Sequence, residues 1–187
     1  DWRTVAHAVC LGLIPLELLP ILNTNTHVDW NKLDGNLLAP VHYVVISSNV
    51  DILKELLTIP PEQLDWNTLD GHGFTPVRHA VEGSLQDASK VDFVKELLTN
   101  PPQGLQVDTL SRGLPPSYYA AKNGQNEILE ILFKAGANLA WKGSEISLLR
   151  EDNVTLPLVA LKECRSDVSS TKLAQQFEIL KFLAEKK

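Results

Sequence analysis

The sequence is poor in cysteine, in basic residues and in long apolar runs, and each shortage excludes a class of protein. Two cysteines in 187 residues are too few for a disulfide scaffold, and they share no metal-ligand spacing. With 17 Lys and Arg against 23 Asp and Glu, the net charge of -6 argues against nucleic acid or an anionic membrane as the partner. The longest apolar stretch, residues 9–22, is interrupted by two prolines and a glutamate, so we expect no membrane span.

Sequence motifs of catalysis are missing as well. There is no Gly-rich phosphate loop, no paired-His zinc motif and no serine nucleophile elbow. We therefore expect no catalytic activity, no cofactor and no metal in these residues. Because position 1 is not methionine, we expect a fragment or a processed form of a longer protein. With no signal peptide and no cysteine framework, the expected location is the reducing cytoplasm.

What the sequence does contain is an internal repeat. Residues 29–46 read DWNKLDGNLLAPVHYVVI, and residues 65–82, 36 positions later, read DWNTLDGHGFTPVRHAVE. Residues 50–61, VDILKELLTIPP, return at 91–102 as VDFVKELLTNPP, with a shift of 41 positions. The larger second shift indicates that residues are inserted between the two halves of the later copy. Such insertions usually lie in surface loops. A period in this range indicates stacked repeats and argues against a single globular core.

Each repeat predicts two short helices and an extended loop. Pro40 fits the first turn of a helix over residues 40–46, because a proline there removes no intrahelical hydrogen bond. In residues 51–58 the apolar residues recur at helical spacing and form a stripe along one side. Two prolines at 60–61 end this second helix. Such a helix pair is too small to bury its own apolar side, so we expect successive pairs to stack on one another.

These features resemble the ankyrin repeat, whose signature is T-P-L-H-x-A, a glycine turn, a second helix and a G-A-D/N ending. Residues 113–139, GLPPSYYAAKNGQNEILEILFKAGANL, carry the resemblance best, through Pro116, Ala120, Ala121, Gly124 and the Gly136-Ala137-Asn138 ending. The resemblance implies an all-α ankyrin-repeat solenoid of stacked helix-turn-helix units with extended β-hairpin-like loops. The chain would form one domain, 1–187, with units 1–33, 34–69, 70–110, 111–143 and 144–187. Its first and last units match weakly, as is expected of terminal repeats.

The resemblance also implies a protein or peptide partner, bound on a concave face that the loop tips and the first helices build. The implied contact positions are Leu33, Asn36, Leu38, Ile46, Leu69, His72, Phe74, Glu82, Arg112, Leu114, Lys122 and Trp141. Apolar residues recur in two columns of these loops, Leu33, Leu69 and Leu110 in one and Leu38, Phe74 and Leu114 in the other. They either form a partly apolar groove for the partner or pack on one another between neighbouring loops.

The tryptophans and histidines of the repeat are candidates for either structural or binding roles. Trp30 and Trp66 are either exposed anchors for a partner or wedges between adjacent repeats. His7 and His42 occupy the signature histidine position, where the resemblance implies hydrogen bonds to the loop backbone. His79 lies one position beyond that column, and the sequence assigns it no role.

The expected function is that of a protein-binding scaffold or adaptor that is monomeric by itself. Two alternatives stay open: the chain is the targeting domain of a larger enzyme, or it is a secreted bacterial effector that works in the host-cell cytoplasm. The full reading frame would separate the three, because a catalytic motif would favour the enzyme and a secretion signal the effector. Inserts near residues 83–90, 143–155 and 164–171 have no function that the sequence reveals.

Overall fold

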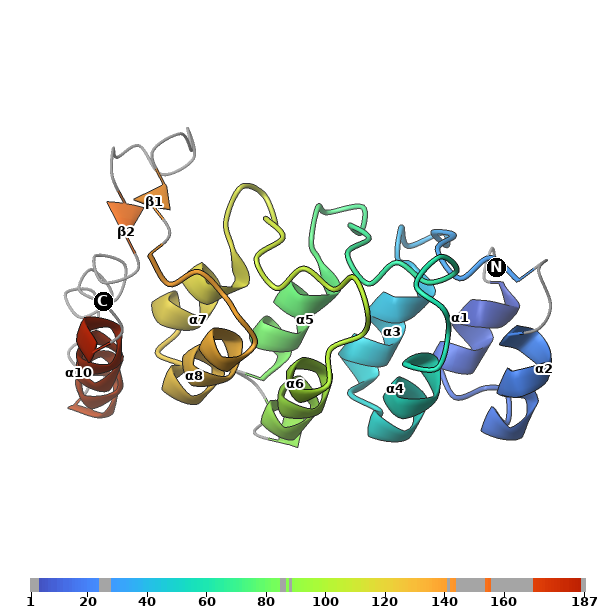
Figure 1. Ribbon diagram of the computed structural model, residues 1–187, viewed down its shortest axis with the longest axis horizontal. Coiled ribbons are helices and arrows are strands. Elements are labelled where there is room, and N and C mark those ends of the chain that lie inside the picture. The colour runs from blue at the N-terminus through green and yellow to red at the C-terminus, as the bar shows by residue number, and fades with distance from the viewer. Residues whose placement is uncertain are drawn as a thin grey trace. The chain divides into compact units, whose positions relative to one another are not determined.

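The computed structural model in Figure 1 is built from short helices joined by extended loops. It describes residues 4–23, 28–84, 87, 89–140, 142–143, 154–155 and 170–185. Packing divides the chain into two compact units, residues 1–106 and 107–187. The second and third inserts of the repeat fall mostly outside the described residues. The division into five sequence repeats stays a prediction.

The first unit contains the helix pairs of the first three repeats. Its helices are α1 (Val5–Cys10), the 3-10 turn η1 (Leu16–Leu18), α2 (Leu19–Asn23), α3 (Pro40–Ser47), α4 (Val50–Leu56), α5 (Pro76–Gly83) and α6 (Ser89–Thr99). The second unit contains α7 (Pro116–Lys122), α8 (Asn126–Lys134) and α10 (Ser170–Glu185). Two-residue strands, β1 (Lys142–Gly143) and β2 (Val154–Thr155), pair antiparallel there. We call the first helix of each pair inner and the second outer.

The starts of the helices follow from local sequence. The inner helices α3, α5 and α7 each begin at a proline, Pro40, Pro76 and Pro116, as the repeat predicted. Side-chain caps satisfy backbone N–H groups that have no partner inside a helix. The Thr75 hydroxyl accepts a hydrogen bond from the Arg78 amide at 3.1 Å, and Asn49 accepts one from the Ile52 amide at 3.0 Å.

Stacking of the helix pairs buries the apolar stripes. In the first unit α1 packs on α3, α3 on α5, and α4 on α6, so inner helices contact inner helices and outer helices contact outer ones (Figure 1). The buried side chains include Val41, Val44, Ile52, Leu53, Leu56, Val77, Val81, Phe93 and Leu97, each at most 2% exposed. In the second unit α7 pairs with α8, and α10 packs on α8 with Ile179 fully buried. The prediction of stacked, all-α helix pairs is confirmed.

The repeated Asp-Trp-Asn triplet turns the chain and connects neighbouring loops. Asp29 and Asp65 each accept a hydrogen bond from the backbone amide two residues later, at 3.0 and 2.8 Å, and so turn the chain. The tryptophans that follow, Trp30 and Trp66, are 1% and 3% exposed. Their burial shows that the hypothesis of exposed partner anchors is wrong, and it agrees with the interpretation as wedges between adjacent repeats.

The asparagine of the triplet ties each loop to the next. Asn31 donates from Nδ2 to the Gln63 carbonyl at 2.8 Å, and its Oδ1 accepts from the Asp65 amide at 2.8 Å. Asn67 repeats the pattern with the Gly104 carbonyl at 2.9 Å and the Gln106 amide at 2.8 Å. Both halves of each amide group therefore bind backbone groups of the following repeat, which need partners in an extended loop.

Asp108 stands at the third position of this series, 41 residues after Asn67. Its Oδ2 accepts from the Asn138 amide at 2.8 Å, as the asparagine Oδ1 atoms do. Its Oδ1 is buried and, within the described part of the chain, has no hydrogen-bond partner. An ionised carboxylate has no N–H to donate, so the second bond of the pattern is missing here.

We predict that Asp108→Asn stabilises the protein. Asn31 and Asn67 each accept from one backbone amide and donate to the carbonyl two residues before it. By the same pattern, the new amide at position 108 would donate to the carbonyl of Gly136, two residues before Asn138. A satisfied buried hydrogen bond contributes about 1 kcal/mol. Urea unfolding should show a higher midpoint at an unchanged slope.

The matched control is the reverse change, Asn67→Asp. It removes a donor that is in use and should lower the free energy of unfolding by about 1 to 3 kcal/mol. A lower midpoint for Asp108→Asn would contradict the assignment.

Candidate functional site

The loop before α3 is closed by the carboxylate of Asp34. One carboxylate oxygen accepts hydrogen bonds from the amides of Asn36 at 2.8 Å and Leu38 at 3.2 Å. The other accepts from the Tyr43 hydroxyl on α3 at 2.5 Å. Burial alone would raise the pKa of Asp34, but the Tyr43 hydroxyl and the two amides outweigh it and lower the pKa below its usual value. The loop is therefore fixed to its own inner helix by a charged acceptor.

The loop before α5 uses the same arrangement with a different partner. Asp70 accepts from the amides of His72 and Phe74, both at 2.8 Å, and its second oxygen lies 2.8 Å from His79 Nε2. Burial opposes ionisation, but the Phe74 amide and His79 outweigh it, so the pKa of Asp70 is lowered. His79 thus takes the place of Tyr43, 36 residues earlier, and this role was missed from the sequence.

The corresponding loop of the second unit has no carboxylate at this position. Ser111 and Leu114 exchange backbone hydrogen bonds of 2.9 and 3.1 Å across a turn that is one residue shorter. Arg112 and Gly113 adopt positive φ angles of 52° and 81° in that turn. The Tyr119 hydroxyl donates to the Ser111 carbonyl at 3.2 Å, so an aromatic hydroxyl still fixes the loop to its helix.

The signature histidines connect each inner helix to the next loop. His7 Nε2 lies 3.0 Å from the Leu38 carbonyl, and His42 Nε2 lies 3.2 Å from the Phe74 carbonyl. The Ala39 amide donates to His42 Nδ1 at 3.1 Å, which places the His42 proton on Nε2, facing the carbonyl. The implied role in binding loop backbone is confirmed for both histidines, and both are fully buried.

Burial holds His42 in its neutral form. Desolvation and the neighbouring His79, whose ring centroid lies 5.5 Å away, lower the pKa of His42 to about 4. The Phe74 carbonyl, the Asp70 carboxylate and the Ala39 amide raise the pKa but do not compensate. His42 is therefore a neutral structural donor at physiological pH.

The implied contact residues differ in exposure. Leu33, Asn36, Ile46, Leu69, His72, Arg112 and Lys122 are exposed, Leu38, Phe74 and Glu82 are half-buried, and Leu114 is only 8% exposed. Trp141 lies outside the described residues. Leu114 pairs with Ser111 through backbone hydrogen bonds, and its side chain is buried. It therefore offers a partner almost no surface.

The two apolar columns of the loops have different environments. Leu33, Leu69 and Leu110 are 38%, 45% and 48% exposed, so this column offers apolar surface to solvent. In the other column, Phe74 lies under the Arg78 guanidinium, 3.9 Å from its carbon to the ring centroid, and its ring centroid is 5.7 Å from that of His79. Contacts within the chain thus cover much of the second column. The first column forms an exposed apolar strip.

Leu37 was missed as an exposed loop residue. Its side chain is 51% exposed and its φ is 59°, a left-handed conformation that costs a leucine about 1 to 2 kcal/mol. The next repeat has Gly73 at the same place, with φ 77°, and that alignment was the signal in the sequence. The Leu37 carbonyl accepts from the Gly71 amide at 2.8 Å, so the two loop tips are directly joined.

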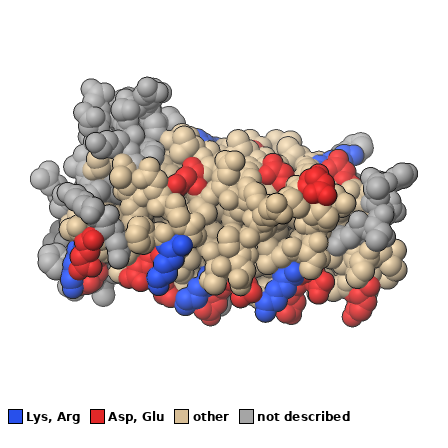
Figure 2. Space-filling view, viewed as in Figure 1, with Lys and Arg blue, Asp and Glu red and all other residues tan. Residues whose placement is uncertain are grey.

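Charged side chains are unevenly spread over the face of the molecule shown in Figure 2. On the face shown in Figure 2, Lys, Arg, Asp and Glu lie mostly along the edge of the outer helices α4 and α6. Asp51 and Lys54 of α4 and Asp92 and Lys95 of α6 are exposed. The surface between that edge and the loops carries few charges on this face (Figure 2).

We predict that Gly71→Ala loosens the contact between the two loop tips. A Cβ atom at Gly71 would collide with the Cβ and Cδ1 atoms of Leu37, so one loop must move. Overpacking of this kind costs about 1 to 3 kcal/mol, which thermal unfolding measures. The second change Leu37→Gly should restore most of the loss, because it removes the colliding side chain.

Gly83→Ala is the control for this experiment. Among the described residues, a Cβ there meets only the flexible Lys90 side chain, 3.3 Å away, and should leave the melting temperature nearly unchanged. Equal losses in both alanine variants, or no rescue by Leu37→Gly, would contradict the contact.

Stability should also fall on mild acidification. The folded pKa of His42 lies near 4, below the ordinary value near 6.5, so the unfolded state binds the extra proton between these values. The stabilisation is complete above about pH 6.5 and decreases toward pH 4, by about 2 kcal/mol between pH 7.5 and pH 5. Below that range Asp34 and Asp70 add to the loss, because their folded pKa values are lowered too.

Urea unfolding at several pH values tests this prediction. His42→Gln should flatten the slope between pH 7.5 and pH 5, whereas His72→Gln, at an exposed loop tip, should keep it. The same slope in the wild type and in His42→Gln would show that His42 is not responsible.

Comparison with known families identifies the repeat. A family model described as ankyrin repeats, in three copies, matches residues 41–142, more than half of the chain. No curated protein matches the sequence. None of the described helices is long and apolar enough to cross a membrane, and the described residues hold no group of three metal-ligating side chains. Ankyrin repeats are generally protein–protein interaction modules and typically not enzymes. The chain belongs to the ankyrin-repeat family.

Proposed function

We propose that this chain is a scaffold or adaptor module that binds a partner protein through its loop tips and inner helices. The proposed contact residues are Leu33, Asn36, Leu37, Leu38, Ile46, Leu69, His72, Phe74 and Glu82 in the first unit and Arg112, Lys122 and Trp141 in the second. Leu114 is left out because it is buried. No joint surface of the two units is needed for the proposal.

The observation that carries the proposal is apolar surface on loops that are held in place. Leu33, Leu37 and Leu69 are 38%, 51% and 45% exposed, on loops closed by Asp34 and Asp70. Exposed leucines on a mobile loop would lose conformational entropy on binding. Loops that are already ordered avoid most of that cost, so more of the contact energy is available for affinity.

Variation at one inner-helix position supports selectivity for a partner. Ile46, Glu82 and Lys122 stand at equivalent places of successive repeats and are apolar, acidic and basic. Arg78 holds Glu82 in an ion pair of 2.6 Å, which orients its carboxylate. A partner that offers complementary groups in the same order would be preferred over one that does not.

We also propose that the chain acts as a monomer in the cytoplasm and forms one domain with the five repeat bounds given above. The free, fully buried thiol of Cys10 is compatible with a reducing compartment. Burial raises the pKa of this thiol, which keeps it unreactive.

The test of the proposed function starts with affinity capture and identification of the bound protein, followed by calorimetric titration with that purified partner. The double variant Leu33→Ser, Leu69→Ser should bind about ten-fold more weakly, because each leucine truncation removes apolar contact. Its melting temperature should stay close to that of the wild type, since both side chains are exposed.

Leu13→Ser is the matched control, because Leu13 is 70% exposed and lies outside the loop tips. It should bind the partner as the wild type does. Unchanged affinity of the double variant, or an equal loss in Leu13→Ser, would refute the proposed surface.

A further inference from the structure

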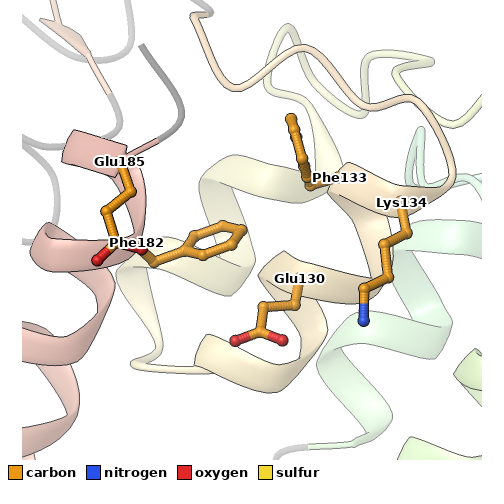
Figure 3. Close-up of a pocket in the computed structure, with 5 residues that line it drawn as sticks. All are labelled: Glu130, Phe133, Lys134, Phe182 and Glu185. Carbon is orange, nitrogen blue, oxygen red and sulfur yellow. The ribbon is translucent and has the colours of Figure 1, made fainter.

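The second unit contains a cleft between the helices α8 and α10. It has a volume of 240 Å³ and is lined by Glu130, Phe133, Lys134, Phe182 and Glu185. The first three residues come from α8 and the last two from α10, two helices that pack on each other. Figure 3 shows the Phe182 side chain extending from α10 toward α8.

Two aromatic rings form the apolar part of this cleft. Phe133 and Phe182 meet edge to face, with ring centroids 6.0 Å apart and an interplanar angle of 87°. Phe133 is 37% exposed, so part of the pair is accessible to a ligand. The faces of aromatic rings carry partial negative charge and attract ammonium and guanidinium groups.

The charged residues at the rim have the sign that a cation needs. Glu130 and Glu185 provide two carboxylates, against the single ammonium of Lys134. In the part of the chain that the structure describes, no hydrogen bond or ion pair engages these three side chains. An anionic ligand does not suit the cleft, because the two carboxylates would repel it. An apolar helix does not suit it either, because it would remove water from the carboxylates at a cost in free energy.

The volume of the cleft limits the size of its occupant. Sites for whole small molecules usually have volumes of about 300 to 1,000 Å³, and this cleft is smaller. It suits a single long side chain, whose charged end would lie between the phenylalanine rings and the carboxylates.

We propose that this cleft binds a lysine or arginine side chain from a basic segment of a partner protein. The cation is held by the aromatic rings of Phe133 and Phe182 and by the carboxylates of Glu130 and Glu185. This site lies on the outer helices and does not depend on the loop-tip surface. Either of the two binding surfaces can fail its test without affecting the other.

The test uses nuclear magnetic resonance of the full chain with a defined peptide. The probe is an acetylated and amidated peptide of glycine and serine that carries two arginines, and the control peptide has citrulline in their place. Citrulline keeps the shape of arginine but is neutral. The arginine peptide should cause saturable shifts at the amides of residues 130–134 and 178–185, and the citrulline peptide should not.

Variants of the lining residues should change the affinity for the arginine peptide in opposite directions. Phe182→Leu should weaken arginine binding about two- to five-fold, because it removes a ring and keeps an apolar side chain. Glu130→Gln and Glu185→Gln should each weaken binding to a similar extent. Lys134→Gln should strengthen binding, because it removes the like charge at the rim.

Glu62→Gln separates the site from general attraction to an acidic protein, because Glu62 is exposed in the first unit. It should leave the affinity unchanged. The proposal is overturned if no saturable shifts occur at α8 and α10, if the citrulline peptide binds equally well, or if Glu62→Gln weakens binding as much as Glu130→Gln. If Phe182→Leu alters the fold, the affinity of Glu185→Gln for the arginine peptide tests the proposal instead.

Discussion

In the first unit, the loops of this protein are held by side chains that reach from one repeat to the backbone of the next. His7 binds the Leu38 carbonyl, His42 binds the Phe74 carbonyl, and Asn31 binds backbone groups of the loop at residues 63–65. Extended loops make few hydrogen bonds of their own, and unsatisfied backbone groups are costly when buried. These bridges therefore help to hold the loop tips of the first unit in place.

The same framework accepts different side chains at equivalent places. Asp34 is bound by Tyr43 and Asp70 by His79, while the second unit replaces the carboxylate with the backbone of Ser111. In each case a side chain from the first half of the inner helix fixes the loop. Because the polar group changes while the geometry is retained, successive repeats keep one fold with different side chains.

Much of the fold was predictable from local patterns. The 36-residue repeat, the prolines at the helix starts and the apolar stripes all act within one repeat, and the structure confirms them. The candidate site was less predictable. His79 had no role until Asp70 was found beside it, and Leu37 became recognisable only through its positive φ and its contact with Gly71.

The sequence by itself determined the family, the period and the position of the helices, because these depend on residues close together along the chain. Only the tertiary structure decided which loop residues are exposed. Leu110 is 48% exposed and Leu114 is 8% exposed, although they belong to the same loop. Burial depends on what packs against a side chain from elsewhere in the chain, and no pattern within a single repeat contains that information.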